Sequence, residues 1–397
     1  MVGLISNWLE AATQLQSHST EPAWLVEKRD HAAQQLAALQ QPNRKLESWR
    51  YADAKRLSQA LSVLTNECAE SNFEVKEQRL NEVVIRIDDR GFHLLSPAPH
   101  WLCVEGIVAV DAEHWNDLCF DQETVVNLAN TMLFNAGVLL SIQPDEKSDL
   151  NSNEVNKIVI EYNFKDRENW QYIRNQICLA DHSQVSIEER FVTGRINVVN
   201  VYDVSDQAKL QRKQNVRMDE TEQFISFNQF DVAENAEILN MNQHHGGLLQ
   251  HHLHRINFNK TGSKYTSGTI NKSSHNNNIS DLVEVNHLHL NNQSDVTHRS
   301  IAKDHSQIFN NAKALVAPGA DQSEIEQDLK NILLSPEAKI FSKPELEVYA
   351  DEVVAAHGST IGALDDQSLF YLQSRGIDVE QAREIMIESF EQEAVVC

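Results

Sequence analysis

The sequence lacks the cysteine patterns that build metal sites and disulfide frameworks. Its 397 residues contain five cysteines, an odd number, and no two of them form a Cys-x-x-Cys pair. A tetrahedral zinc site or a self-contained iron–sulfur cluster needs four closely placed ligands, which these scattered thiols do not supply. We therefore expect no disulfide framework and no cofactor held tightly by this chain alone.

Long apolar runs and clusters of basic residues are absent as well. No stretch of 18 apolar residues occurs, and residues 1–10 carry one acid and no base, unlike a secretory signal. The 34 basic residues face 58 acidic ones, and the net charge of −24 repels phosphate backbones. There is also no Gly-x-x-x-x-Gly-Lys-Ser/Thr loop for nucleotide phosphates. We expect a cytoplasmic protein without nucleic acid or membrane partners.

The first part of the chain has the periodicity of amphipathic helices. Apolar residues recur three and four positions apart between 24 and 39, after Pro22, which suits the start of a helix. We expect further helices at 54–64 and at 124–135.

The middle of the chain, from about 157 to 316, reads almost entirely as short strands of roughly 5–8 residues. No Asn-Gly or Asp-Gly hairpin dipeptide occurs there, and asparagine recurs at the expected corners. Asparagine tolerates left-handed backbone and can hydrogen-bond with an asparagine one coil above. This favours a stacked solenoid, with a β-sandwich left open because no fixed repeat is visible. The corner asparagines are Asn271, Asn276, Asn277, Asn278, Asn286, Asn291, Asn292, Asn310 and Asn311.

The C-terminal part returns to helical periodicity. We expect amphipathic helices at 322–334, at 364–372 and at 379–391. Asp378 is a candidate N-cap for the last helix, and Gly376 stands where the helix before it should end. The last two helices predict an αα-hairpin with an exposed apolar flank.

Ordered motifs in the C-terminal third carry the most specific signal. They are Ser335-Pro336-Glu337-Ala338, the run Lys-Pro-Glu-Leu-Glu-Val-Tyr-Ala-Asp-Glu-Val at 343–353, and Ala-His-Gly-Ser-Thr-Ile-Gly at 356–362. With Asn43-Arg44-Lys45 and Glu-Ser-Trp-Arg-Tyr at 47–51, they resemble the SufB/SufD family of iron–sulfur cluster assembly scaffold proteins. The short chain without Cys-x-x-Cys motifs is similar to the SufD branch.

The resemblance implies a right-handed parallel β-helix flanked by N- and C-terminal helical domains, which favours the solenoid over the sandwich. It also implies a non-catalytic scaffold that pairs with a SufB-like chain and docks a SufC-like ATPase, or pairs with itself when isolated. A transient iron–sulfur cluster would form at the SufB–SufD interface, and reduced FAD is a candidate cofactor of the complex. The expected domains are 1–82 (helical), 83–150 (mixed transition), 151–355 (β-helix core) and 356–397 (helical).

His357 is the candidate residue for cluster assembly. Neutral imidazole is a good iron ligand and carries protons near neutral pH, and Gly358 would allow a bend that presents it at an edge. The resemblance implies a place at the SufB–SufD interface and a role as a transient iron ligand. The alternative is a histidine hydrogen-bonded in a tight turn. The chain departs from many SufD sequences at Ala355, where a cysteine commonly stands.

The apolar stripe of the C-terminal hairpin is the candidate ATPase-docking surface, which would also cap the last coil. Its residues are Leu369, Phe370, Leu372, Ile385, Met386 and Phe390.

A group of histidines in the strand region is a weak candidate for a metal site. His252 and His254 share a strand face, but two histidines are too few for a closed site. We expect His244, His245, His251, His252, His254, His287 and His289 to lie on polar outward faces. A polysaccharide-cleaving β-helix enzyme would need paired carboxylates, and no dense Asp/Glu cluster stands out in the strand region. A homo-oligomeric solenoid interaction protein remains the other alternative.

Overall fold

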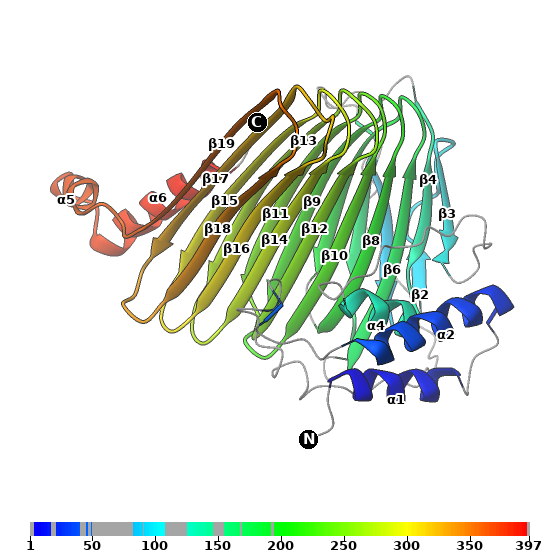
Figure 1. Ribbon diagram of the computed structural model, residues 1–397. Coiled ribbons are helices and arrows are strands. Elements are labelled where there is room, and N and C mark those ends of the chain that lie inside the picture. The colour runs from blue at the N-terminus through cyan, green and yellow to red at the C-terminus, as the bar shows by residue number, and fades with distance from the viewer. Residues whose placement is uncertain are drawn as a thin grey trace.

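The computed structural model is a parallel β-solenoid with helices at both ends (Figure 1). It describes residues 4–16, 21–39, 45–46, 49, 82–89, 91–107, 125–145, 155–166, 169–191 and 194–394. The helices are α1 (Leu4–Gln16), α2 (Ala23–Ala38), α4 (Val125–Leu133), α5 (Asp366–Ser374) and α6 (Val379–Gln392). The strands are β1 (Glu82–Asp88), β2 (Gly91–Leu94), β3 (Leu102–Gly106), β4 (Val138–Ile142), β5 (Lys157–Tyr162), β6 (Trp170–Leu179), β7 (Gln184–Phe191), β8 (Arg195–Val204), β9 (Lys209–Met218), β10 (Gln223–Val232), β11 (Glu237–Gly246), β12 (Leu249–Phe258), β13 (Lys264–Ser273), β14 (Asn278–His287), β15 (Gln293–Ala302), β16 (Gln307–Val316), β17 (Ser323–Leu333), β18 (Lys339–Val348) and β19 (Val353–Gly362). The predicted fold class is confirmed.

From β4 onward successive strands alternate between two sheets, so that each coil contributes one strand to each. Sheet A has the order β19-β17-β15-β13-β11-β9-β7-β5-β1-β2, and sheet B has the order β18-β16-β14-β12-β10-β8-β6-β4-β3. From β5 onward the pairings in both sheets are parallel, whereas β1–β2 and β3–β4 are antiparallel. This parallel stacking decides between the two open alternatives, because a sandwich of hairpins would pair antiparallel strands.

The coils differ in length, which explains why no fixed repeat is visible in the sequence. Trp170 is the register partner of Arg195, an offset of 25 residues, whereas Gln307 is the partner of Lys339, an offset of 32. The strands keep their register, and the corners take up the difference. A search for a constant period therefore fails although the architecture is periodic.

The helix expected at 322–334 is wrong, because this segment is strand β17. Ile325 and Leu329 are four residues apart and Ile332 follows three later, which imitates the spacing of a helical stripe. In the structure the odd-numbered residues from Ser323 to Asn331 are buried and the residues between them are more exposed. The true period is two, and both periods fit such a short segment.

The corners use left-handed backbone, but mostly at residues other than the predicted asparagines. Positive φ angles occur at His182, Gln207, Asn235, His275, Asn291, Asp304 and Gln322. Of the nine predicted corner asparagines only Asn291 adopts this conformation. Asn271, Asn278, Asn286, Asn310 and Asn311 lie within strands. The expected stacking of asparagines does occur, since Asn286 donates to Asn257 of the neighbouring coil at 2.9 Å.

The N-terminal helices cover one face of sheet B near its first strands (Figure 1). Helices α2 and α4 match the predictions at 24–39 and 124–135, and the helix expected at 54–64 lies outside the described residues. Arg29 of α2 is buried and donates to the carbonyl oxygens of Met132 and Phe134, so it caps the C-terminal end of α4. These helices share an apolar cluster with sheet B.

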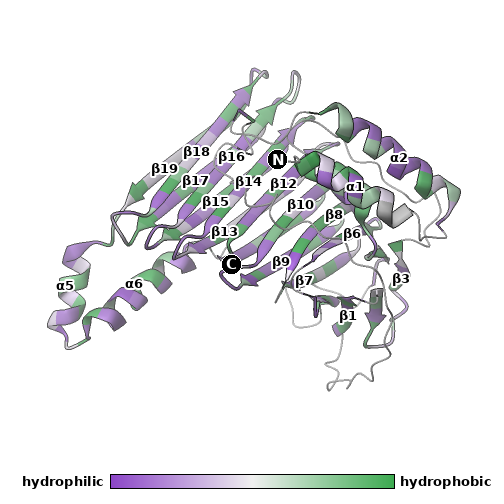
Figure 2. Cartoon of the chain, turned by 90° about the horizontal axis from the view of Figure 1, so that it is seen from below, coloured by the Kyte–Doolittle hydropathy of each residue, from purple (hydrophilic) through white to green (hydrophobic). Residues whose placement is uncertain are grey.

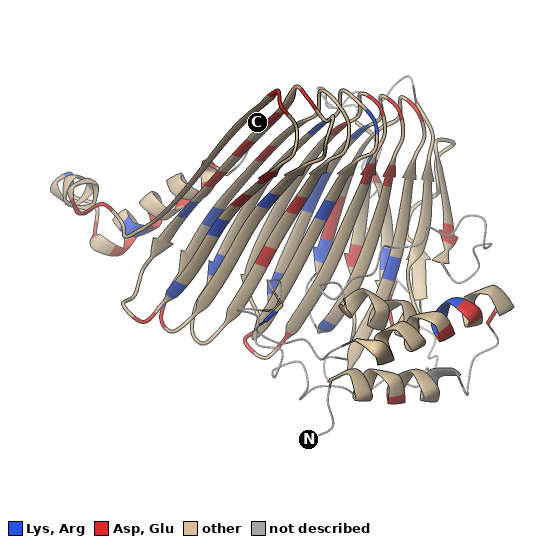
Figure 3. Cartoon of the chain, in the orientation of Figure 1, with Lys and Arg blue, Asp and Glu red and all other residues tan. Residues whose placement is uncertain are grey.

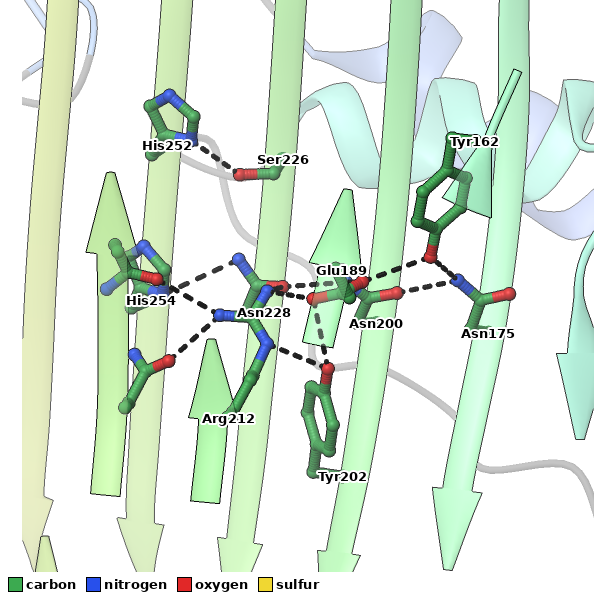
Figure 4. A network of polar contacts seen from close by, with 12 residues as sticks. Tyr162, Asn175, Glu189, Asn200, Tyr202, Arg212, Ser226, Asn228, His252 and His254 are labelled. Carbon is green, nitrogen blue, oxygen red and sulfur yellow. Dashed lines mark hydrogen bonds and ion pairs between the residues drawn. The ribbon is translucent and has the colours of Figure 1, made fainter. Parts of the chain in front are cut away.

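The space between the two sheets, here called the lumen, is partly polar. Asn175, Asn200 and Asn228 come from three successive coils and lie in one line (Figure 4). Asn175 donates a hydrogen bond to Asn200, and Asn200 donates one to Asn228, each at 2.8 Å. Glu189 pairs with Arg212, and both side chains are fully buried. A buried ion pair of this kind adds little net stability but strongly penalises any shift of the coils that would separate the charges.

Arg212→Met is expected to destabilise the solenoid by about 3–5 kcal/mol, because Glu189 would remain buried without its counter-charge. The double variant Glu189→Met with Arg212→Met should recover most of this loss. Arg190→Met, which removes an exposed arginine from surface pairs, should cost less than about 1 kcal/mol. Urea unfolding followed by circular dichroism measures the three. A double variant as unstable as the single one would contradict the pairing argument.

Candidate functional site: the open end and the helical hairpin

The last coil leaves both sheets with an uncovered edge, here called the open end. Strand β19 pairs with β17 and strand β18 with β16, and no described strand continues either sheet. Two large apolar side chains on β19 face solvent, Val354 at 70% and Ile361 at 48% exposure. Proteins usually protect such an edge with charge, proline or a covering segment. An edge of this kind is a template for a further strand.

His357 lies in the middle of β19 and points toward the mouth of the lumen. Its register partner is Gln327, which is buried on the lumen side of β17, so His357 takes the same face one coil later. Ser359, two residues on, donates to Ser342 of β18 across this mouth at 2.8 Å. The imidazole itself is exposed. The expected bend at Gly358 and the tight-turn alternative are both wrong, since β19 runs extended through this position.

Strand β19 also crosses the expected boundary between the β-helix and the C-terminal helical domain at 355/356. At the other end, β1 and β4 pair with β5 and β6, so strands from within 83–150 belong to the same two sheets.

Helices α5 and α6 form the expected hairpin, which projects beyond the strands (Figure 2). Asp378 accepts hydrogen bonds from the amides of Glu380 and Gln381 and so caps α6, as predicted. Asp365 caps α5 in the same way through Ser368. Gly376 has a φ of +90° directly after α5, a conformation that favours glycine and ends the helix.

The predicted docking residues divide between two faces of the hairpin. Phe370 and Ile385 are 72% and 44% exposed, whereas Leu369 lines the cleft between the hairpin and the solenoid. Phe390 lies beneath the guanidinium group of a solenoid arginine. Leu372 and Met386 are half-buried. The prediction missed Tyr371, which is 57% exposed and extends the apolar surface at Phe370.

The histidine group lies largely inside the solenoid, so the expectation of outward polar faces is wrong. His244, His252, His254 and His287 are buried in the lumen, and His251 is buried on the opposite face of β12, against Trp49. His245 is half-buried, and His289 is exposed in the corner after β14. His244 of sheet A stacks on His252 of sheet B with ring centroids 3.5 Å apart, which places both rings in the lumen. The ring nitrogens of His252 contact Ser226 at 2.9 Å (Figure 4) and Gln250 at 2.9 Å.

A buried carboxylate, Asp281, lies beside these rings. Burial favours its neutral form, but the hydrogen-bonding contact with His244 and the nearby His298 and His254 hold the pKa of Asp281 well below its ordinary value. Its Oδ2 accepts a hydrogen bond from Asn271 at 3.3 Å and lies 3.6 Å from Nδ1 of His244. Within the described residues, no three His, Cys, Asp or Glu side chains are placed to hold a metal ion.

The two described cysteines do not form a reactive pair. Cys103 is exposed on β3, and Cys178 is half-buried on β6. Burial raises the pKa of the Cys178 thiol to about 11, which keeps it protonated at neutral pH. Cys68, Cys119 and Cys397 lie outside the described residues.

The fold and the site define a parallel β-solenoid with one bare end and a projecting helical hairpin. A family model described as "SUF system FeS cluster assembly, SufBD core domain" matches residues 162–390, more than half of the chain. The chain therefore belongs to the SufBD core family, and the predicted membership of the SufB/SufD family is confirmed. Among the described residues, none of the helices has the length and apolar character needed to span a membrane.

Individual relatives match over parts of the chain. The iron–sulfur cluster assembly protein SufD of Escherichia coli is 37% identical over 93 residues, 23% of this chain and 22% of the relative. A SufBD family protein of Synechocystis is 35% identical over 108 residues, 27% of this chain and 23% of the relative. SufD of Plasmodium berghei is 25% identical over 289 residues, 68% of this chain and 21% of the relative. The matches thus span about a fifth of the length of these relatives.

The buried histidines predict that the free energy of unfolding falls at acidic pH, and His251→Phe tests the contribution of one of them. The ring of His251 lies against Trp49, with centroids 4.5 Å apart and the planes tilted by 31°, and neither ring nitrogen has a hydrogen-bond partner among the described residues. Burial lowers its pKa to about 4, so between pH 6.5 and 4 the unfolded state binds a proton that the folded state does not. This histidine therefore lowers the free energy of unfolding by about 1.4 kcal/mol per pH unit as the pH falls through that window.

His251→Phe should reduce that slope by about this amount, whereas exposed His289→Phe should leave it unchanged. Urea unfolding at pH 4.5 to 7.5 measures the slopes, and equal slopes for both variants would refute the assignment.

Proposed function

We propose that this chain is a cytoplasmic, non-catalytic scaffold subunit of a SUF iron–sulfur cluster assembly complex. In this proposal it pairs through its open end with a SufB-like chain and carries a SufC-like ATPase on its hairpin. Family membership supports the assembly role, and the bare edge of β18 and β19 is the observation that carries the pairing. A strand of a second solenoid can continue each sheet there by backbone hydrogen bonds.

His357 would take part in assembly of the transient cluster, which is cargo of the complex. Its imidazole is exposed at the mouth of the lumen, beside the edge that the partner would cover. Once covered, it would sit between the two chains, where a neutral imidazole can bind iron or move a proton. Ala355 lies on the same face two residues earlier and supplies no thiolate, so the thiolate ligands would come from the partner.

The buried carboxylates of the lumen do not favour the alternative of a polysaccharide-cleaving enzyme. The lumen carboxylates Glu189 and Asp281 are fully buried, and each is engaged by neighbouring cationic or polar side chains. Glycosidase carboxylates instead flank a cleft that admits the sugar.

Reduced FAD does not fit the cleft behind the hairpin. This cleft of about 710 Å³ is lined by Lys272, Lys303 and Arg383 together with four carboxylates, an unfavourable setting for a diphosphate. The four are Asp366, Glu380, Glu384 and Glu388.

His357→Ala should leave folding and complex formation intact but abolish cluster assembly in cells, because it removes one exposed imidazole at the mouth of the lumen. The matched control is His289→Ala, which removes another exposed imidazole, in the corner after β14 and outside the open end. Co-purification reports complex formation, and the activity of an iron–sulfur enzyme in the same cells reports assembly. Full assembly with His357→Ala would end the proposal for this residue.

Two surface variants should separate the proposed partners. Val354→Lys places a charge on the exposed edge strand and should weaken pairing with the SufB-like chain at least about tenfold. Phe370→Ser removes the most exposed apolar side chain of the hairpin and should weaken ATPase binding by a similar factor.

Each variant should leave the other interaction intact, as measured by pull-down and by light scattering of the reconstituted complex. Loss of the same partner in both variants would contradict the assignment of two separate surfaces.

A further inference from the structure

The hairpin is joined to the solenoid at two places. One is the link 363–365 after β19, and the other is the last turn of α6, where Ala394 is fully buried. Between the two lies the open cleft of about 710 Å³, with Leu333 and Leu369 on opposite walls. Figures 1 and 2 show the hairpin projecting away from the strands. Its position therefore depends on what holds the last turn of α6.

Arg299 of β15 is the centre of that attachment. Its side chain is 3% exposed, and its Nη2 lies 2.7 Å from Asp328 of β17 and 3.1 Å from Glu393 at the end of α6. The ring of Phe390 lies 5.7 Å from the guanidinium carbon. One guanidinium group thus joins the hairpin to a strand of sheet A.

Two lysines support the same turn. Lys272 of β13 pairs with Glu391 at 2.8 Å, and Lys330 of β17 pairs with Glu393 at 3.1 Å. Figure 3 shows acidic and basic residues side by side where α6 reaches the strands. The attachment is therefore mainly ionic.

A notch in sheet A receives the end of the helix. A Cβ atom at Gly268 of β13 would collide with the backbone oxygen of Ala394 and come within 2.8 Å of Met241 Cε. The missing side chain admits Ala394, and any larger residue would displace it.

The same groups reach the edge strand of the open end. Asp328 is the register partner of Gly358, next to His357, and Lys330 is the register partner of Thr360. Part of the attachment thus lies on β17, the strand that β19 pairs with, and the rest lies on β13 and β15.

We propose that the last turn of α6 is a reversible ionic latch, formed by Glu391, Glu393 and Ala394 on Lys272, Arg299, Lys330 and the Gly268 notch. When closed, it fixes the hairpin and braces β17 beneath the edge strand that carries His357. When open, the hairpin swings about the link 363–365. The ion pairs of Lys272 and Lys330 are partly exposed and individually weak, and Arg299 keeps Asp328 as its partner when Glu393 leaves, so an open state populated at about 0.1–10% is within reach of a bound partner.

The latch deepens the proposed function, since an ATPase seated on the hairpin would act on it. That consequence rests on the proposed docking, whereas the latch is a property of the chain by itself. The experiment therefore uses the full chain without partners, so that its failure is distinct from failure of docking.

The test compares Glu393→Gln and Gly268→Ala with the unmodified chain by hydrogen–deuterium exchange. Opening the latch should speed exchange in residues 379–394 by roughly fivefold or more, and speed it measurably in β17 and β19. Raising NaCl from 0.05 to 0.5 M should speed exchange in the unmodified chain more than in Glu393→Gln, in which only the Lys272–Glu391 pair of the latch is left for salt to screen.

Matched controls use residues outside the latch. Glu380→Gln removes an exposed carboxylate that pairs with Arg383 within α6, and Gly362→Ala adds a methyl group with nothing within 4 Å. Both should exchange as the unmodified chain does. Unchanged exchange of 379–394 in both Glu393→Gln and Gly268→Ala would overturn the latch. Faster exchange there with β17 and β19 unchanged would overturn the coupling to the edge.

Discussion

Backbone pairing between successive coils in parallel register is the constraint on which the rest of the structure depends. Each strand from β6 to β17 has a neighbour on both sides in its sheet, so the hydrogen bonds of one coil are completed by the next. If a strand paired in the wrong register, its lumen side chains would lie opposite residues other than their native partners. The polar lumen makes such errors costly, because Glu189 and Arg212 are buried and satisfy each other.

The same register carries side chains from the core to the surface of the open end. Following one lumen column of sheet A along the register, Val296 is succeeded by Gln327 and then by His357. Inside the stack such positions are covered by the next coil, but at the last coil nothing described covers them. His357 is thus a residue of the lumen face that the end of the solenoid leaves open to solvent.

Much of the architecture could be predicted from the sequence, and the failures have physical causes. The order of helical, strand and helical segments and the caps at Asp378 and Gly376 follow from local patterns. The histidines were misplaced because a polar residue on an alternating strand looks the same whether it faces solvent or a polar lumen. The contact between the rings of His244 and His252 shows that both face the lumen, and this contact joins strands of different sheets, which a local sequence pattern does not record. The exposure of Tyr371 and the notch at Gly268 likewise depend on contacts between distant segments, which no local pattern records.

The two ends of the solenoid differ in how their edge strands are paired, and this difference affects how the chain can associate with another. At the N-terminal end, β1–β2 and β3–β4 turn antiparallel, which stops the parallel stack from growing. At the other end the edge strand β19 ends the stack without such a turn and exposes Val354 and Ile361 rather than charges. An isolated protein with that edge would be prone to self-association. A solenoid closed at one end and open at the other can join one further solenoid end to end, and the result is a closed pair rather than a fibre. The latch beside this edge ties the C-terminal hairpin to β13, β15 and β17, and the link 363–365 ties it to β19, so a movement of the hairpin acts on the strands of sheet A that lie next to the joint.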